Sequence, residues 1–231
     1  MKYLRGFSFF LATLAMYLGV SLVGWGIGAI PAFAALPPRL GYAVVVTLFS
    51  LAVGWQGIND PEGVQGAQGH GQEGKRVWRQ TFVSYSLTTI LFAAMLFLPF
   101  ADRRDIAVAQ FGMAVRWAGV ALAAAGYALI FWSGLALGRQ YSAEVTIQKN
   151  HHLITAGPYR YIRHPRYLGI LGLALGVALL FRSWIGLLLF VLLPLPLIQR
   201  MQDEEALMHR EFGAEWEEYC QRSWRLIPRV Y

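Results

Sequence analysis

The stretch GPYRYIRHPRYLG, residues 157–169, concentrates polar chemistry in a chain that is otherwise 56% hydrophobic. It holds three arginines, one histidine and three tyrosines. Pro165 disfavours helix at the residue before it, so a helix is predicted to begin at Pro165 with His164 at its cap. The unpaired amides of a first helical turn and the helix dipole attract negative charge. We therefore expect this segment to bind a carboxylate or a phosphate, with Arg163 as a candidate partner.

Two adjacent carboxylates, Glu204 and Glu205, follow a short apolar segment that contains Pro194 and Pro196. Prolines within an apolar span leave backbone carbonyls without helical partners, which is tolerated where protein or a cavity satisfies them. An acidic pair and free carbonyls are then predicted to face the basic helix start at His164. This combination suits a ligand that carries both a carboxylate and a positively charged nitrogen or sulfur.

Several of these residues also have plainer explanations. Arg160 and Arg166 fit the excess of basic residues on the cytoplasmic side of membrane proteins. Glu204 is able to pair with Arg200, four residues earlier on the same helix. A stripe of small residues on the following helix either lets a neighbouring helix approach closely or accommodates a ligand, and its members are Gly169, Gly172 and Gly176.

Other kinds of site find little support in the sequence. A metal site is not expected, because repeated histidine clusters are missing and Glu205 with His209 is an ordinary helical pair. The single cysteine, Cys220, excludes an intrachain disulfide and a cysteine-based zinc site. The glycines of GWGIG, residues 24–28, lie inside an apolar run and do not form a nucleotide-binding turn. The side chains considered for a metal are His151, His152, His164, Glu205 and His209.

Membrane-spanning helices must position these residues. A charged fraction of only 14% is typical of membrane proteins. Four apolar runs reach the length of about 17 to 25 residues that crosses a bilayer, and two shorter runs read as a helical hairpin. The predicted fold is all-α and integral to the membrane, with about six transmembrane helices including a C-terminal hairpin. The predicted spans are residues 7–30, 40–58, 82–100, 113–137, 165–181 and 184–199.

The distribution of basic residues predicts the orientation of the chain. The apolar stretch near the start is too long for a cleaved signal peptide, so it is interpreted as a retained first span. Six crossings place both ends on one side, which the basic residues mark as cytoplasmic. The candidate active site is then expected at the cytoplasmic face. All but five of the 20 basic residues lie on that side, the exceptions being Arg39, Arg103, Arg104, Arg116 and Arg182.

The chain is expected to divide in two. Residues 1–137 are predicted to form a four-helix transmembrane scaffold, because their apolar runs hold almost no charge. Residues 138–231 are predicted to form the cofactor-binding catalytic region. The glycine-rich segment 59–77 reads as a loop without chemistry. Spacings of three to five between large apolar residues predict an amphipathic helix on the cytoplasmic face, with Leu207, Phe212, Trp216 and Tyr219 on its apolar side.

The segment HHLITAGPYRYIRHPRYLG resembles the motif H-x-L-V-T-x-G-P-Y-x-x-x-R-H-P-x-Y-x-G of the isoprenylcysteine carboxyl methyltransferase family and its relatives, the phospholipid N-methyltransferases. A second family motif, an acidic pair followed by F-G-x-x-Y/W-x-x-Y and a terminal I-P, is similar to Glu204, Glu205, FGAEWEEY and Ile227-Pro228. The resemblance extends over residues 138–231. Residues 1–137 resemble the family only in being hydrophobic.

The resemblance implies an integral membrane methyltransferase that uses S-adenosylmethionine. Such transfer depends on holding the acceptor, the methyl carbon and the sulfur in line with water excluded. The catalytic candidates are Arg163, which would grip an anionic acceptor or the cofactor carboxylate, and Glu205, which takes a proton only from an acceptor that needs a base. The cofactor-binding residues that the resemblance implies are His151, Leu153, Ile154, Gly157, Pro158, Tyr159, His164, Tyr167 and Glu204.

The acceptor and the partners are left open by these motifs. An isoprenylcysteine carboxylate, a phospholipid amine and a small thiol all fit a lipophilic or small-molecule acceptor that arrives from the bilayer. The net charge of +7 indicates orientation toward anionic lipid rather than nucleic-acid binding. No obligate protein partner is inferred.

Two alternative functions compete with methyl transfer. The tail FGAEWEEYCQRSWRLIPRVY is also similar to that of membrane sterol reductases, which carry R-H-P-x-Y-x-G and use NADPH. This chain has fewer predicted spans than those reductases and lacks a further basic motif to select the 2'-phosphate. A non-enzymatic membrane scaffold built on the same hairpin is the third possibility. The motifs favour the methyltransferase.

Overall fold

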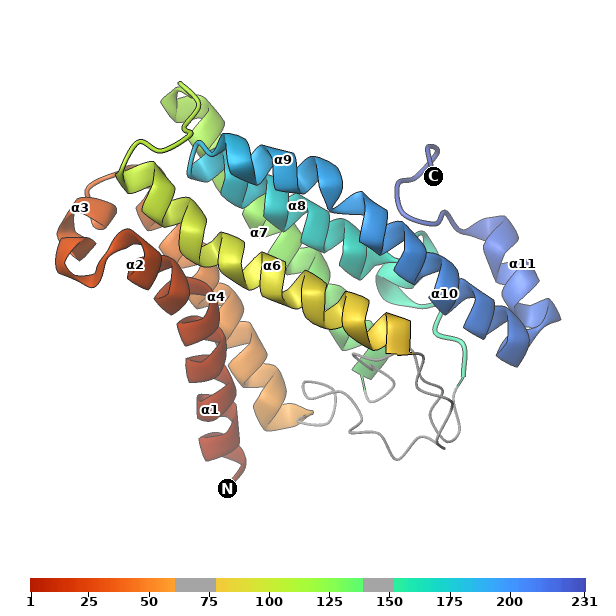
Figure 1. Ribbon diagram of the computed structural model, residues 1–231. Helices are drawn as coiled ribbons and strands as arrows, with labels where there is room; N and C mark the ends of the chain where they lie inside the picture. The colour runs from red at the N-terminus through yellow and green to blue at the C-terminus, as the bar shows by residue number, and fades with distance from the viewer. Residues whose placement is uncertain (61–77, 139–151) are drawn as a thin grey trace.

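The computed structural model describes residues 1–60, 78–138 and 152–231, and the regular elements of these residues are helices (Figure 1). The N-terminal helices are α1 (Lys2–Leu14), the π-helical turn η1 (Ala15–Gly19), α2 (Val20–Trp25), the short turn η2 (Ile27–Ala29), α3 (Ile30–Ala34) and α4 (Pro37–Asn59). The long helices α6 (Trp78–Arg103) and α7 (Met113–Leu137) follow. The C-terminal elements are the 3-10 turn η4 (Gly157–Arg160), α8 (Pro165–Leu180), α9 (Trp184–Leu192), α10 (Pro194–Phe212) and α11 (Ala214–Arg222).

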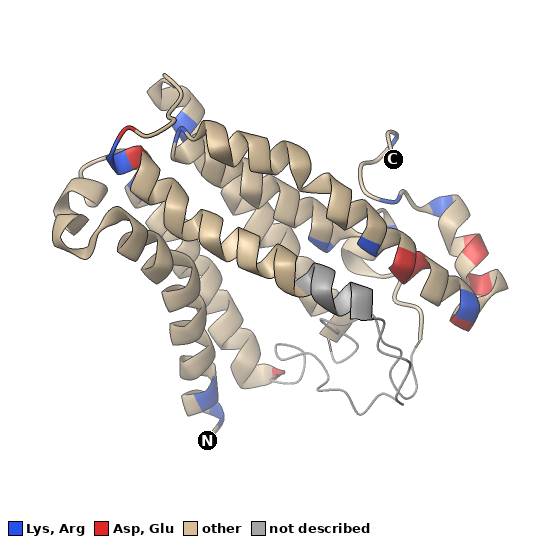
Figure 2. Cartoon of the chain, in the orientation of Figure 1, with Lys and Arg blue, Asp and Glu red and all other residues tan. Residues whose placement is uncertain are grey.

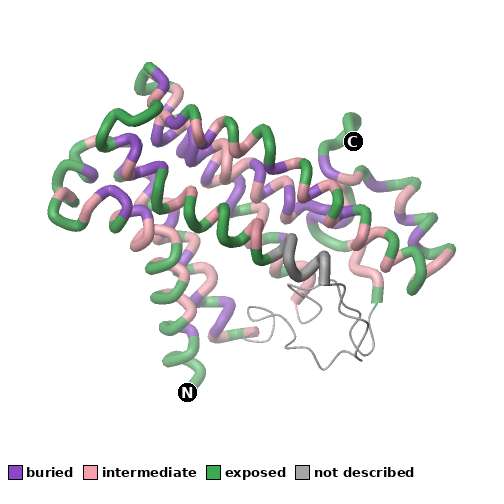
Figure 3. Tube along the Cα trace, viewed as in Figure 1, coloured by how far each residue is buried: buried purple, intermediate pink, exposed green. Residues whose placement is uncertain are grey.

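Five helices in the described residues are long and apolar enough to cross a membrane. They cover Lys2–Trp25, Pro37–Asn59, Tyr85–Arg103, Met113–Leu137 and Trp184–Phe212. The sixth predicted span, α8, has 16 residues and is about 24 Å long, less than the roughly 30 Å of a hydrocarbon core. Large apolar side chains are exposed along these helices. Figure 3 shows the many exposed residues of α1, next to the N-terminus. The helical, membrane-integral class is therefore confirmed, with five long spans and one short helix.

Glycines bring α7 and α8 into close contact along their length. A Cβ on Gly126 of α7 would lie 2.6 Å from the carbonyl oxygen of Gly169, and one on Gly176 of α8 would lie 2.6 Å from that of Gly119. Backbones approach this closely only where side chains are missing. The small-residue stripe of Gly169, Gly172 and Gly176 thus serves helix packing, and the backbone of α7 fills the space that a ligand would need there.

A separate apolar cluster fixes α10 against α8 near the polar motifs. Leu197 and Met201 of α10 are fully buried and pack with Tyr167 and Leu171 of α8 and with Leu226 of the tail. Buried apolar contacts of this kind contribute about 25 cal/mol per Å² removed from water outside the bilayer. This cluster sets the register at which α10 presents its carboxylates to the start of α8.

The C-terminal half differs from its prediction in two places. Pro194 and Pro196 barely interrupt the second arm of the hairpin, because Leu193 keeps helical backbone angles and α10 begins at Pro194, where a missing amide costs nothing. The arm therefore continues to Phe212 rather than ending near residue 199. The predicted single amphipathic helix is in fact the end of α10 plus α11, separated by Gly213 at φ 49°, a left-handed angle that glycine adopts readily.

Charge gathers at both ends of the helical bundle (Figure 2). At the end opposite the polar motifs, the fully buried carboxylate of Asp102 accepts from Arg39 at 2.6 Å, Arg182 at 2.8 Å and Arg116 at 3.4 Å. We name these four residues the distal cluster. From the sequence these arginines were expected only as outer-side charges, because a pairing across residues 39 to 182 leaves no local pattern.

Candidate active site

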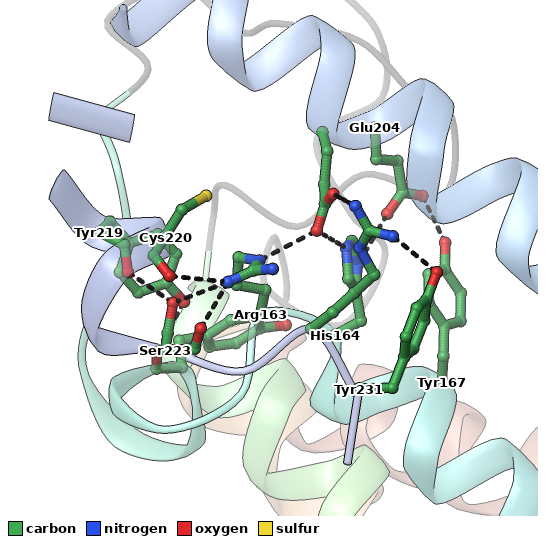
Figure 4. A network of polar contacts seen from close by, with 11 residues as sticks. Arg163, His164, Tyr167, Glu204, Tyr219, Cys220, Ser223 and Tyr231 are labelled. Carbon is green, nitrogen blue, oxygen red and sulfur yellow. Dashed lines mark hydrogen bonds and ion pairs between the residues drawn. The ribbon is translucent and has the colours of Figure 1, made fainter. Parts of the chain in front are cut away.

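The start of α8 and the middle of α10 bring a histidine between two carboxylates (Figure 4). His164 is 7% exposed and caps α8 as predicted. Its Nδ1 lies 3.5 Å from Oε2 of Glu204, and its Nε2 lies 3.3 Å from Oε1 of Glu205. The predicted meeting of the basic helix start with the acidic pair is confirmed. The first turn offers fewer free amides than expected, since Tyr167 N–H donates to the His164 carbonyl at 3.1 Å.

On the Glu204 side, Tyr167 and Arg200 complete a polar triangle. Tyr167 O–H donates to Oε1 of Glu204, and Arg200 donates through Nε to the same oxygen at 3.0 Å and to the Tyr167 hydroxyl at 2.7 Å. The Tyr167 ring stacks on His164 with centroids 5.6 Å apart. The ordinary helical pairing of Arg200 with Glu204 is therefore real, and it forms part of the site rather than replacing it.

On the other side, two arginines hold Glu205. Arg163 donates through Nε to Oε1 at 3.0 Å, and Arg225 donates through Nη2 to Oε2 at 2.5 Å. Arg225 in turn donates through Nη1 to the hydroxyl of Tyr231 at 2.6 Å. Both oxygens of Glu205 are thus engaged by cations, an arrangement that stabilises the ionised carboxylate.

The tail after α11 is hydrogen-bonded through its backbone to the segment before α8. Trp224 N–H donates to the Tyr161 carbonyl at 3.0 Å, Arg163 N–H donates to the Trp224 carbonyl at 2.8 Å and His164 N–H donates to the Arg225 carbonyl at 3.1 Å. The side chain of Arg163 adds to this pairing by donating through Nη1 to the carbonyl of Ser223 at 2.5 Å. The backbone of His164 is therefore fixed by the same segment that supplies Arg225.

Electrostatics favours charged side chains in this network. Burial lowers the pKa of His164, but the hydrogen bonds to Glu204 and Glu205 raise it more, so that its pKa lies above the ordinary value. The hydrogen bond to Glu205 raises the pKa of Arg225. The site is a set of compensating ion pairs in which a ligand with both charges can exchange partners.

Gly157, Pro158 and Tyr159, at the start of η4, contribute shape rather than charge. Gly157 has φ 60° and packs on the C-terminal end of α7, where an added Cβ would lie 3.2 Å from that of Ala136. Pro158 and Tyr159 are buried, and the Tyr159 carbonyl accepts from the Tyr219 hydroxyl at 2.6 Å. Burial raises the pKa of Tyr219 to about 12, so this hydroxyl stays a neutral donor.

The remaining predicted positions lie away from the ion pairs or outside the described residues. Leu153 and Ile154 are half-buried in the extended segment that leads to η4. His151 lies outside the described residues. His209 pairs with Glu217 at 2.9 Å rather than with Glu205. Among residues 1–60, 78–138 and 152–231, no group of three or more His, Cys, Asp and Glu side chains is arranged to hold a metal ion.

Comparison with known proteins bears on the same part of the chain. Residues 119–210 match the model of the isoprenylcysteine carboxyl methyltransferase (ICMT) family. The protein-S-isoprenylcysteine O-methyltransferase of Schizosaccharomyces pombe is 35% identical over 96 residues, which are 40% of this chain and 41% of that protein. A probable protein-S-isoprenylcysteine O-methyltransferase of Oryza sativa subsp. indica is 30% identical over 119 residues, 50% of this chain and 62% of that protein. The match thus spans about half the length of these relatives.

Residues 119–210 of this chain are thus similar in sequence to the ICMT family. This segment runs from α7 to the end of α10 and contains His164, Tyr167, Glu204 and Glu205. The relatives named above are O-methyltransferases, which favours the methyltransferase over the reductase and the non-enzymatic scaffold.

Arg225, Ser223 and Tyr231 lie beyond the matched ICMT segment, and the sequence analysis missed them. The signal that pointed toward them was the similarity of Ile227-Pro228 to the terminal I-P of the family. That signal places the tail near the site without saying which of its side chains reaches the carboxylates.

Proposed function

We propose that this chain is a membrane methyltransferase that transfers a methyl group from S-adenosylmethionine to a carboxylate on a lipophilic acceptor. The observation that carries the proposal is His164 held between Glu204 and Glu205, with Arg163 and Arg225 on the outer oxygens. The S. pombe relative, by its name, methylates an isoprenylated cysteine at oxygen.

The residues present fit the proposed cofactor. S-adenosylmethionine supplies a methyl group on a cationic sulfur and also carries a carboxylate and an ammonium group. Glu204 and the Tyr167 ring suit the cationic part, since aromatic faces and carboxylates attract cations. Arg225 has a buried Nε that lacks a hydrogen-bond partner among the described residues, a donor available to a carboxylate. The proposed cofactor-binding residues are His151, Leu153, Ile154, Gly157, Pro158, Tyr159, His164, Tyr167 and Glu204.

The state of Glu205 favours a carboxylate as acceptor. An amine or a thiol must lose a proton on methylation and needs a base, whereas a carboxylate attacks as it is. Glu205 is a poor proton acceptor, because both of its oxygens already accept from Arg163 and Arg225. We therefore assign Glu205 the role of holding these two arginines in place, and Arg163 the role of orienting the acceptor carboxylate.

Calorimetry on the detergent-purified chain tests the cofactor. We expect S-adenosylhomocysteine to bind with micromolar affinity and NADPH to give no measurable heat. Glu204→Gln, which keeps the shape of the side chain and removes its charge, is expected to abolish this binding while the chain stays folded. Preference for NADPH would move the assignment to the reductase.

A direct competition tests the acceptor. The chain, with cofactor carrying a deuterated methyl group, is supplied with a farnesylated cysteine, phosphatidylethanolamine and a long-chain thiol, and the products are read by mass spectrometry. We expect label in the methyl ester of the farnesylated cysteine. Label in the amine or the thiol alone would contradict the role given to Glu205, whatever the cofactor result.

We also propose that the candidate active site faces the cytoplasm with both chain ends, and that residues 138–231 carry the chemistry on a scaffold formed by residues 1–137. The excess of basic residues at the site end supports this orientation. In a Cys220→Ser background, Arg104→Cys at the opposite end should react with an impermeant maleimide added outside intact cells. Protection of that cysteine until the membrane is permeabilised would reverse the orientation.

A further inference from the structure

The distal cluster carries more positive than negative charge. Its single carboxylate, Asp102, has no exposed surface, whereas the side chains of Arg39, Arg116 and Arg182 are 10%, 9% and 16% exposed. Arg182 has a second partner, Asp105 at 3.0 Å, which is 75% exposed. Three guanidinium groups therefore share one buried carboxylate at the end of the membrane-spanning bundle, where burial of unbalanced charge is costly.

The helices add to this positive potential. Arg39 lies in the first turn of α4, Arg116 lies in the first turn of α7, and Arg182 directly precedes Ser183, the N-cap of α9. Each helix N-terminus carries a partial positive charge from the helix dipole. Three N-termini and three arginines thus converge at one end of the protein.

One donor of the cluster is left unsatisfied. Arg39 is 8% exposed, and its Nε is buried with no hydrogen-bond partner in the described part of the chain. The Arg39 guanidinium stacks on the ring of Trp25 at 4.0 Å, which fixes its plane. A buried unpaired donor on a cation is rare and indicates a missing acceptor.

The depth of the cluster identifies the kind of acceptor. Arg39 and Arg116 follow the first residues of two helices that are long enough to cross a bilayer, so they lie at the level where lipid phosphates lie. The guanidinium group of arginine offers two parallel N–H donors that match the oxygens of a phosphate group. Basic pockets between transmembrane helices bind anionic lipid head groups. We propose that the distal cluster binds the phosphate group of an anionic phospholipid in the leaflet opposite the candidate active site.

Native mass spectrometry on the detergent-purified full chain tests this site. Phosphatidylglycerol is titrated against diacylglycerol with the same acyl chains, which lacks the phosphate. We expect phosphatidylglycerol to bind at least about tenfold more tightly. In Arg39→Gln the dissociation constant of phosphatidylglycerol should rise about tenfold. Arg39→Lys keeps the positive charge but loses the paired N–H donors of the guanidinium group, so its dissociation constant should lie between those of the wild type and Arg39→Gln. Arg104→Gln is the matched control, since Arg104 lies at the same end but stacks on Phe100 at 3.9 Å outside the cluster.

The outcomes separate the possible occupants. Inorganic phosphate, added to the complex with phosphatidylglycerol, tests whether the site also accepts the free anion. Displacement of the lipid at millimolar phosphate supports a site that recognises the phosphate group. Equal binding of diacylglycerol and phosphatidylglycerol to the wild-type chain would overturn the proposal without any variant. Undiminished binding to a folded Arg39→Gln chain would overturn it too, leaving the cluster a purely internal ion network.

Discussion

Glu205 accepts from side chains that come from opposite ends of the C-terminal region. Arg163 reaches it from the segment before α8, and Arg225 reaches it from the tail after α11. The carboxylate therefore joins α10 to both of these segments. Its role in the proposed reaction is to keep two guanidinium groups at fixed positions.

Replacement of Arg225 tests this role. A charged hydrogen bond contributes about 1.5 to 3 kcal/mol, so Arg225→Ala should lower kcat/KM about 10- to 100-fold, with Arg225→Lys in between. Methyl-transfer assays with a prenylated cysteine measure the effect. Arg222→Ala is the control, because Arg222 forms only an exposed pair with Glu218 at 3.4 Å. Equal losses in both variants would show that Arg225 acts through general charge.

His164 gives the site a dependence on pH. Its raised pKa means that its charged form contributes to stability fully below about pH 6.5 and that this contribution is lost as the pH rises through the higher folded value. Melting temperatures in detergent should therefore fall above that pH in the wild type and less so in His164→Gln. His209→Gln, at an exposed pair with Glu217, should melt like the wild type at each pH. If His164→Gln showed the same dependence of melting temperature on pH as the wild type, His164 would not be the group responsible for it.

The sequence predicted those site residues that lie in ordered motifs. His164 precedes a proline, and Glu204 and Glu205 form an acidic pair, so residue type and position pointed to them, whereas Tyr167 was expected only from the resemblance to the family motif. Arg225 was missed because its position depends on the pairing of residues 161–164 with the tail. Such a pairing joins segments about sixty residues apart and has no periodicity to reveal it.

At the level of elements, the contact between α7 and α8 decides where the site lies. Both helices meet through glycines at Gly126 and Gly169, which sets the height of His164 relative to the rest of the bundle. The short α8 has too few residues to hold this position by crossing the bilayer alone.

Gly126→Ala should weaken this contact. The added methyl group would lie 2.6 Å from a backbone oxygen of α8, so the helices must separate, at a cost of about 1 to 3 kcal/mol. Gly134→Ala on the same helix has no atom within 4 Å of the new Cβ and is the control. Thermal unfolding in detergent compares the two, and equal melting temperatures would contradict the close packing.

Element boundaries were predictable where proline or composition marks them. The start of α8 at Pro165 and the whole of α7 match their predictions. The continuation of α10 to Phe212 was missed, because Pro194 reads as a break although a proline at the first helical position is harmless. The division of the tail at Gly213 was missed because apolar spacing alone does not show a left-handed residue.

The whole molecule has two polar ends joined by apolar helices (Figure 2). At one end ion pairs surround His164, and at the other they surround Asp102. Asp102 connects the ends of α4, α6 and α7 to the turn between α8 and α9. The distal cluster therefore fixes the turn that follows α8, and the opposite end of α8 carries His164.

Asp102→Asn should destabilise the chain strongly. Removal of the charge leaves three arginines without their buried counter-ion, and breaking a buried ionic network costs about 3 to 5 kcal/mol. The measurement is the melting temperature together with the yield of monodisperse protein in detergent. Asp105→Asn, at a carboxylate that is 75% exposed, is the control and should differ little from the wild type. Similar melting of both variants would show that the cluster contributes little.

The short length of α8 ties the chemistry to bilayer thickness. Since α8 and α9 are joined at the distal end, His164 lies only about 24 Å from that turn, whereas α9 and α10 together extend 29 residues from the same turn. Lipids with longer acyl chains would submerge the candidate active site, and shorter ones would lift it into water, in each case at a cost from hydrophobic mismatch. Turnover in vesicles of increasing acyl-chain length should therefore pass through an optimum, and a flat dependence would show that the site adjusts its depth independently of the surrounding lipid.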